Sequence, residues 1–116
     1  MPEAKVTMTV RKPNSTVSII DIEGQVTGFA EKVMNEVYEE ANANGASFIL
    51  LNFAKLEYMN SSGIGLIVTM LIRAQRNNNK LAAYGLSPHY RQIFELTRLE
   101  DAIAIFETEA DALEAV

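Results

Sequence analysis

The sequence predicts a single α/β domain in which helices pack against a mixed, mostly parallel β-sheet. Two segments of strand character come first, and short apolar runs then alternate with amphipathic segments in the order β-β-α-β-α-β-α-β-α. The apolar run at 47–53 is continuous, as in a strand that is buried on both faces. With 116 residues, 48% of them hydrophobic, the chain can fill one core, so we expect a single domain over residues 1–116.

The N-terminal third is predicted to contain two strands and a helix. KVTMTV alternates apolar and polar residues, and the turn residues KPNS separate it from the strand TVSIIDI, which ends at Glu23 and Gly24. We expect these strands to form an antiparallel hairpin. The next helix starts at the N-cap Thr27 and ends before Gly45. Its apolar face combines Phe29, Val33, Val37 and Ala41 with Met34 and Tyr38.

The rest of the chain continues the alternation of strand and helix. The strand SFILLNF is followed by the connection AKLEYMN, and then by a helix from Ile64 to about Asn78 that is apolar on most of its circumference. KLAAYGL is the next strand. Ser87 is placed to cap the following helix, with Pro88 at its first position, where the missing N–H does no harm. AIAIF is the last strand, and Thr108 caps the final helix.

Composition and charge exclude several classes of protein. The absence of cysteine rules out disulfides, cysteine-bound zinc, iron–sulfur clusters and thiol catalysis. The N-terminus lacks the layout of a signal peptide, and no apolar run approaches the roughly 18 residues of a membrane span, so we expect a cytoplasmic protein without membrane attachment. Direct binding to nucleic acid is not expected, because ten scattered basic residues are outnumbered by fifteen acidic ones.

The stretch YMNSSGIGLIV, residues 58–68, calls for an explanation. Gly63 and Gly65 in a first helical turn together cost about 2 kcal/mol relative to alanine. A dinucleotide-binding fingerprint would need a third glycine where Val68 stands, and a phosphate-binding loop would need a G-K-[ST] string that is absent. A serine nucleophile lacks a base, because the only histidine, His89, lies in a different helix. No catalytic residue, metal site or cofactor is therefore assigned.

Two interpretations of the polar residues in this stretch remain open. In the first, one of Asn60, Ser61 and Ser62 is simply the helix N-cap. In the second, the hydroxyls and glycines form an unshielded helix start that a kinase can reach. A phosphate there would gain about 0.3–1 kcal/mol from the helix dipole and would change the surface charge by about −2.

Three ordered segments resemble the STAS domains of bacterial anti-sigma factor antagonists. The stretch LNFAKLEYMNSSGIGLIV resembles the family signature D-S-[ST]-G-L-G with the strand before it. VSIIDIEGQVTGFAEKVMNEV resembles the second strand, the G-E-L-D turn and the first helix, and LSPHYRQIFELTRL resembles the S-P-x-x-x-x-x-F-x-x-x-x-L segment. The resemblance covers nearly the whole chain and implies a STAS-type α/β sandwich that is not an enzyme.

The resemblance also implies a mechanism. A typical family member binds, when unphosphorylated, an anti-sigma factor that is also a serine kinase, and phosphorylation of a serine at the helix start separates the two proteins. By this resemblance Ser61 is the phosphoacceptor, and a serine phosphatase is a candidate second partner. Tyr58, Met59 and Ile64 supply either apolar contact or core packing. The expected partner-binding residues are Asn60, Ser62, Gly63, Ile64, Gly65, Thr27 and Met59.

Three positions depart from the family pattern. Asn60 replaces the acidic residue before the serine, and Gln25 and Thr27 replace the glutamate and aspartate of the G-E-L-D turn. The neutral side chains of Asn60 and Thr27 favour an alternative function, a constitutive STAS adaptor subunit in a regulatory or transport assembly that is not switched by phosphate.

Overall fold

The computed structural model describes residues 5–116, and its elements follow the predicted order. Residues 1–4, which belong to the predicted domain, lie outside the described residues. The strands are β1 (Val6–Arg11), β2 (Val17–Val26), β3 (Phe48–Met59), β4 (Lys80–Tyr84) and β5 (Ala104–Phe106). The helices are η1 (Gly28–Ala30), α1 (Glu31–Asn42), α2 (Ser61–Arg76), α3 (Pro88–Leu96), η2 (Leu99–Asp101) and α4 (Glu109–Ala115), of which η1 and η2 are 3₁₀ turns.

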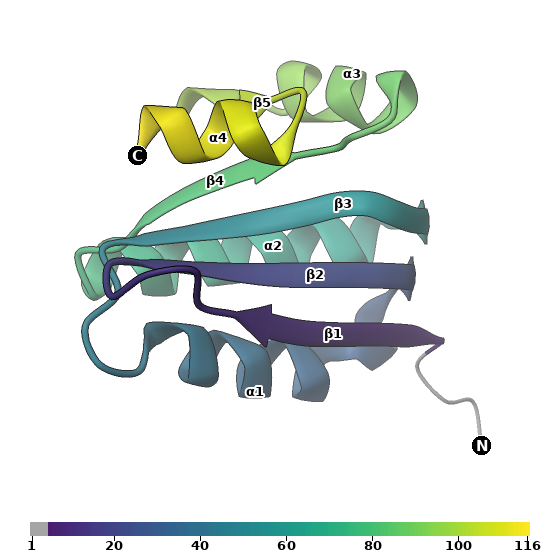
Figure 1. Ribbon diagram of the computed structural model, residues 1–116. Helices are drawn as coiled ribbons and strands as arrows, with labels where there is room; N and C mark the ends of the chain where they lie inside the picture. The colour runs from purple at the N-terminus through teal and green to yellow at the C-terminus, as the bar shows by residue number, and fades with distance from the viewer. Residues whose placement is uncertain (1–4) are drawn as a thin grey trace.

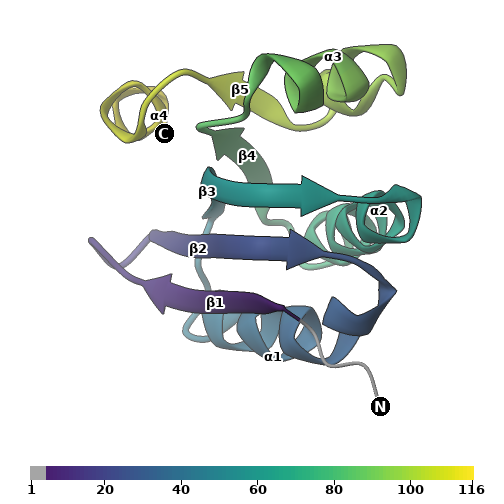
Figure 2. The ribbon, with the colours of Figure 1, turned by 90° about the vertical axis from the view of Figure 1, so that its right-hand side faces the viewer.

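The strands form one five-stranded sheet in the order β1-β2-β3-β4-β5 (Figure 1). β1 pairs antiparallel with β2 and the other neighbours pair in parallel, which confirms the predicted hairpin and mixed sheet. Right-handed crossovers that all step the same way across the sheet place α1, α2 and α3 on one face. Helix α4 follows the last strand, and Figure 2 shows it on the opposite side of the sheet from α2.

The two faces of the sheet carry cores of different size. The larger core lies beneath α1, α2 and α3 and includes the fully buried side chains of Ile20, Leu51 and Ile67. Within it, the rings of Phe53 and Phe94 meet edge to face, with centroids 6.0 Å apart. The smaller core lies under α4 and contains Val17, Ile19, Leu50, Ala82, Tyr84 and Ala112.

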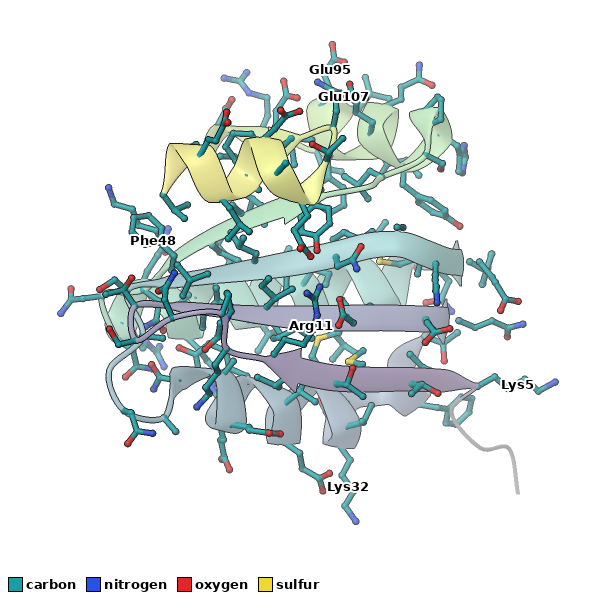
Figure 3. The ribbon with its side chains drawn as sticks, in the orientation of Figure 1. Lys5, Arg11, Lys32, Phe48, Glu95 and Glu107 are labelled. Carbon is teal, nitrogen blue, oxygen red and sulfur yellow. The ribbon has the colours of Figure 1, made fainter. Side chains whose placement is uncertain are left out.

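Arg11 connects three elements across the face that carries α4. Its Nε donates to Oδ2 of Asp21 at 2.6 Å, and its Nη2 donates to Oε1 of Glu109 at 2.6 Å. The Tyr84 hydroxyl donates to the same Glu109 oxygen at 2.6 Å. In Figure 3 the Arg11 side chain lies over the front of the sheet. Helix α4 is thus held by an ion-pair network as well as by apolar contact.

The predicted caps of the two C-terminal helices are confirmed. Oγ of Ser87 accepts a hydrogen bond from the N–H of Tyr90, and Pro88 occupies the first helical position. Oγ1 of Thr108 accepts from the N–H of Asp111 at 3.1 Å. Each cap satisfies an amide that the helix itself leaves without a partner.

Two predictions about the second strand and the first helix are wrong. β2 does not end at Glu23 and Gly24 but continues to Val26, because Gly24 adopts a φ of 96° and a shift in register absorbs the irregularity. The α-helix begins at Glu31, because Thr27 caps the 3₁₀ turn η1 instead, with Oγ1 accepting from the N–H of Phe29 at 3.3 Å.

The 3₁₀ turn also changes the apolar face predicted for this helix. It breaks the 3.6-residue period, so Phe29 is 60% exposed, whereas Val37 and Ala41 are buried as predicted. At the other end the helix stops at Asn42. Asn44, the residue before Gly45, already has a positive φ, so the asparagine is the first residue after the helix in the left-handed conformation.

The boundaries around the third strand also differ from the prediction. β3 runs to Met59, so the predicted connection at 54–60 is mostly strand, because the extended β2 provides it with a partner as far as Val26. Helix α2 begins at Ser61 rather than Ile64, and it ends at Arg76 rather than near Asn78. The last strand is shorter than 102–106, because the two residues that follow the 3₁₀ turn η2, Ala102 and Ile103, are not part of it.

Candidate functional site

The predicted phosphoacceptor lies where the carboxyl ends of two parallel strands meet the N-terminus of a helix. β2 and β3 end side by side, with Val26 opposite Met59, and α2 begins two residues after Met59. The turn η1 completes the site, because a Cβ atom on Gly28 would lie 3.5 Å from Cβ of Ser62. Carboxyl ends of parallel strands are the usual location of binding sites in α/β folds.

Asn60 is the N-cap of α2, which settles the capping question that the sequence left open. Its Oδ1 accepts a hydrogen bond from the N–H of Gly63 at 2.9 Å, and its carbonyl accepts from the N–H of Ile64 at 3.0 Å. Its own N–H donates to the carbonyl of Val26 at 3.3 Å. The cap is therefore anchored to β2, and the helix does not need either serine hydroxyl for capping.

Ser61 and Ser62 are both exposed. Among the hydrogen bonds found within residues 5–116, none involves either hydroxyl. Ser61 is the first residue of a 16-residue helix, so its hydroxyl lies at the positive end of the helix dipole. This arrangement presents a free hydroxyl at a position that favours an added negative charge.

The two glycines of the first turn have opposite surroundings. A Cβ on Gly63 would collide with the carbonyl oxygen of Val26 and would lie 3.0 Å from Cγ of Met59, so this glycine allows α2 to approach β2. A Cβ on Gly65 would meet no atom within 4 Å, and the residue is exposed. The fold therefore requires glycine at position 63. At position 65, glycine leaves the surface beside Ser61 without a protruding side chain.

The other predicted contact residues are unequally accessible. Met59 is only 4% exposed and belongs to the larger core, so of the two roles considered for its side chain the structure supports core packing. Thr27 and Ile64 are half-buried. Tyr58 is 49% exposed and lies three residues before the start of α2.

Sequence reasoning missed part of the apolar surface around the serines. Ser61, Gly65, Val68 and Ile72 follow one outward-facing row of α2, in which Val68 is 37% and Ile72 is 44% exposed. Of the five large hydrophobic side chains found exposed in residues 5–116, four lie on η1, β3 and α2, the elements that meet at Ser61, and the fifth, Leu96, is the last residue of α3. The available signal was the apolar circumference of this helix, which is wider than one buried face requires.

Ser61 and Ser62 lie on an exposed surface of the domain. A groove of about 530 Å³, lined by residues that include Leu71, Gln75 and Val116, lies toward the other end of α2. Residues 5–116 contain no group of three or more His, Cys, Asp or Glu side chains that could hold a metal ion. None of the helices described there combines the length and apolar character that crossing a bilayer requires.

Comparison with known proteins places this geometry in a family. The family model of the STAS domain matches residues 7–112. The chain is 27% identical over 88 residues to an anti-sigma-B factor antagonist of Staphylococcus aureus, an alignment that covers 76% of this chain and 82% of the relative. A protein of the same description from Staphylococcus epidermidis is 26% identical over 88 residues.

Solved structures share the fold over nearly the whole chain. An anti-sigma factor antagonist from Mycobacterium paratuberculosis superposes with a TM-score of 0.81 at 18% identity, covering 96% of this chain and 93% of that one. The unphosphorylated form of the anti-sigma factor antagonist SpoIIAA gives a TM-score of 0.73 at 18% identity, with 94% and 96% covered. The phosphorylated form of SpoIIAA from Bacillus gives a TM-score of 0.73 at 20% identity, with 94% and 98% covered.

Proposed function

Because the chain belongs to the STAS domain family, we propose that it is an anti-sigma factor antagonist controlled by phosphorylation of Ser61. Its unphosphorylated form binds an anti-sigma factor that is also a serine kinase, and a serine phosphatase restores this form. One observation carries the proposal. An exposed serine, whose hydroxyl forms no hydrogen bond found within residues 5–116, begins α2, and exposed apolar side chains lie on the elements around it.

The exposed apolar side chains explain how a partner is held. Tyr58 precedes the serine, Phe29 projects from the neighbouring turn η1, and Val68 and Ile72 continue along α2. Apolar surface removed from water contributes roughly 25 cal/mol per Å², and aromatic side chains dominate the energetics of many interfaces. A partner that covers these four side chains also covers Ser61.

Electrostatics explains how phosphate releases the partner. On the free protein, a phosphate on Ser61 is solvated and favoured by the helix dipole, so the fold persists. In the complex the same charge is buried without a counter-ion, which costs about 3–5 kcal/mol. At 1.4 kcal/mol per tenfold, the partner binds roughly two to three and a half orders of magnitude more weakly.

The relatives named above are consistent with this assignment. The Staphylococcus aureus relative is an anti-sigma-B factor antagonist. SpoIIAA has been solved in an unphosphorylated and a phosphorylated form, and both share the fold described above. These descriptions belong to those proteins, and they support the proposal by analogy.

A second candidate function, a constitutive adaptor, is favoured by two neutral residues at the site. Asn60 and Thr27 stand where the family has acidic residues, and both side chains are engaged in capping, with Gly63 and Phe29 respectively. An adaptor would use the same surface and would exist in one form, without phosphate.

The experiment that separates the two functions compares partners captured from native lysate by the wild type, Ser61→Asp and Ser61→Ala. Ser15→Asp is the matched control, because Ser15 is an exposed serine in the turn between β1 and β2. We expect a serine kinase to be captured by the wild type, Ser61→Ala and Ser15→Asp, and to be lost with Ser61→Asp. Capture of the same partners by all four proteins would instead establish the adaptor.

A further inference from the structure

The backbone immediately before Ser61 lacks a neighbouring strand on one side. β3 pairs with β4 only over Phe48–Asn52, whereas it pairs with β2 as far as Met59. Two shifts in register, after Asp21 and after Gly24 of β2, make this extension irregular. A backbone amide that points away from β2 here has no strand to receive its hydrogen bond.

The hydroxyl of Tyr90 on α3 takes the place of the missing strand. It accepts a hydrogen bond from the N–H of Met59 at 2.8 Å, in a buried setting. The next amide, that of Asn60, donates to the carbonyl of Val26 on β2 at 3.3 Å. The two peptides before the phosphoacceptor are thus held from opposite sides, one by α3 and one by β2.

Tyr90 is itself firmly placed. Its side chain is only 8% exposed and belongs to the larger core. The connection into α3 lies against the same stretch of β3, because a Cβ on Gly85 would lie 2.8 Å from the nitrogen of Ala54. Gly85 also has a φ of 79°, so the chain turns there in a conformation that favours glycine.

We propose that Tyr90 is a positioning residue for the phosphoacceptor, because its hydroxyl fixes the Met59 peptide and thereby the cap Asn60 and the direction of Ser61. A phosphoacceptor must be held within about 0.5 Å of its productive position, and a mobile peptide two residues earlier would not hold it so. The role toward a kinase rests on the proposed function, whereas the ordering of the backbone does not.

Tyr90→Phe tests the inference, with Tyr38→Phe as its matched control. Both substitutions keep the ring and remove one buried hydroxyl. The hydroxyl of Tyr38 donates to Oδ1 of Asn79 at a distance of 2.6 Å, and Asn79 follows the C-terminal end of α2, away from Ser61. Amide hydrogen exchange is followed by NMR in the purified proteins. We expect the amides of Met59, Asn60 and Gly63 to exchange about tenfold faster in Tyr90→Phe, the effect of losing one buried hydrogen bond.

The control decides whether the effect is local. In Tyr38→Phe the same three amides should change no more than the amides that exchange by global unfolding. Equal acceleration of the three amides in both variants, or none in Tyr90→Phe, overturns the inference.

A second measurement addresses the partner. The kinase captured by the wild type should bind and phosphorylate Tyr90→Phe about tenfold less well and Tyr38→Phe normally, since misplacement by about 1 Å costs up to 10²-fold. Normal binding and phosphorylation of Tyr90→Phe would overturn the positioning role toward the kinase. If the wild type captures no kinase, the proposed function fails, while faster local exchange in Tyr90→Phe still supports the ordering of the backbone by Tyr90.

Discussion

The α-carbon of Gly63 faces the carbonyl group of Val26 so closely that no side chain fits between α2 and the end of β2. A Cβ atom there would lie 2.8 Å from the carbonyl carbon of Val26, inside normal contact distance. The same helix turn contains Gly65, whose surroundings are open. Two glycines that look alike in the sequence therefore have different reasons to be glycine.

Alanine at these two positions should have opposite effects. Gly63→Ala forces backbone against backbone and should lower the free energy of unfolding by about 1–3 kcal/mol, the usual cost of overpacking. Gly65→Ala should raise it by up to about 1 kcal/mol, because alanine is the better helix former and meets no neighbour. Urea denaturation of both variants checks the pair. Similar stabilities would contradict the role of Gly63.

Removal of the N-cap should destabilise the protein, whereas an acidic cap should not. Asn60→Ala leaves the amide of Gly63 without its acceptor and should cost about 1 kcal/mol. Asn60→Asp keeps the acceptor oxygen, so its free energy of unfolding should stay close to that of the wild type. Denaturation curves of the three proteins under one buffer test this, and a large loss in Asn60→Asp would argue against the capping geometry.

A negative charge on residue 61 should leave the fold intact. Ser61→Asp places a carboxylate in the first turn of α2 and should stabilise the protein by about 0.3–1 kcal/mol at low salt, with the gain fading as salt screens it. Ser15→Asp, in a turn outside any helix, should show no such gain. Thermal unfolding at two salt concentrations distinguishes them. If Ser61→Asp loses more than about 1 kcal/mol, the site cannot host phosphate in the manner proposed.

Acid should loosen the attachment of α4. Hydrogen bonds from Arg11 lower the pKa of Asp21 and of Glu109, and the hydroxyl of Tyr84 adds to the effect on Glu109. A carboxyl with a lowered pKa in the folded state stabilises above its unfolded pKa, here 3.8 for aspartate and 4.5 for glutamate. This contribution is lost as pH falls through the lower folded values. Stability should therefore decline below about pH 5.

Glu109→Gln should make the loss of stability at acid pH less steep, because the glutamine side chain does not titrate. The ion pair between Arg11 and Glu109 is partly solvent-exposed, so its contribution to the free energy of unfolding at neutral pH should be modest, about 0.2–1 kcal/mol. Glu114→Gln is the matched control, since Glu114 lies on the same helix and forms none of the ion pairs found in residues 5–116. Stability curves between pH 3 and 7, a range chosen to span the carboxyl titrations, compare the three proteins. An equally steep loss of stability at acid pH in Glu109→Gln would refute the assignment.

Local sequence signals, which involve residues close together in the chain, predicted the order of the elements and several helix starts. Ser87 with Pro88, and Thr108 before the last helix, mark helix starts through contacts within three or four residues. The antiparallel hairpin and the order of the elements could be read from the sequence, whereas α2 starts at Ser61, three residues before the predicted start at Ile64.

Features that depend on distant parts of the chain could not be predicted from pattern. The second half of β3 is largely exposed and irregular, so no alternation marks it as strand, and only its pairing with β2 reveals it. The apolar period of α1 predicts a buried Phe29, but the 3₁₀ turn Gly28–Ala30 interrupts that period. The contacts of Gly63 with Val26 and of Tyr90 with Met59 join residues far apart in sequence, and no local pattern encodes them.

The shortness of β5 implies that local stability differs between parts of the molecule. β5 joins β4 over three residues, and α4 rests on the smaller core with Arg11 as its polar anchor. Local opening should begin there, because few contacts must break, and native-state hydrogen exchange would show these amides as the least protected. Such an opening would expose Ile19 and Leu50 to solvent and favour self-association, while Ser61, beside the end of the central strand β3, stayed in place.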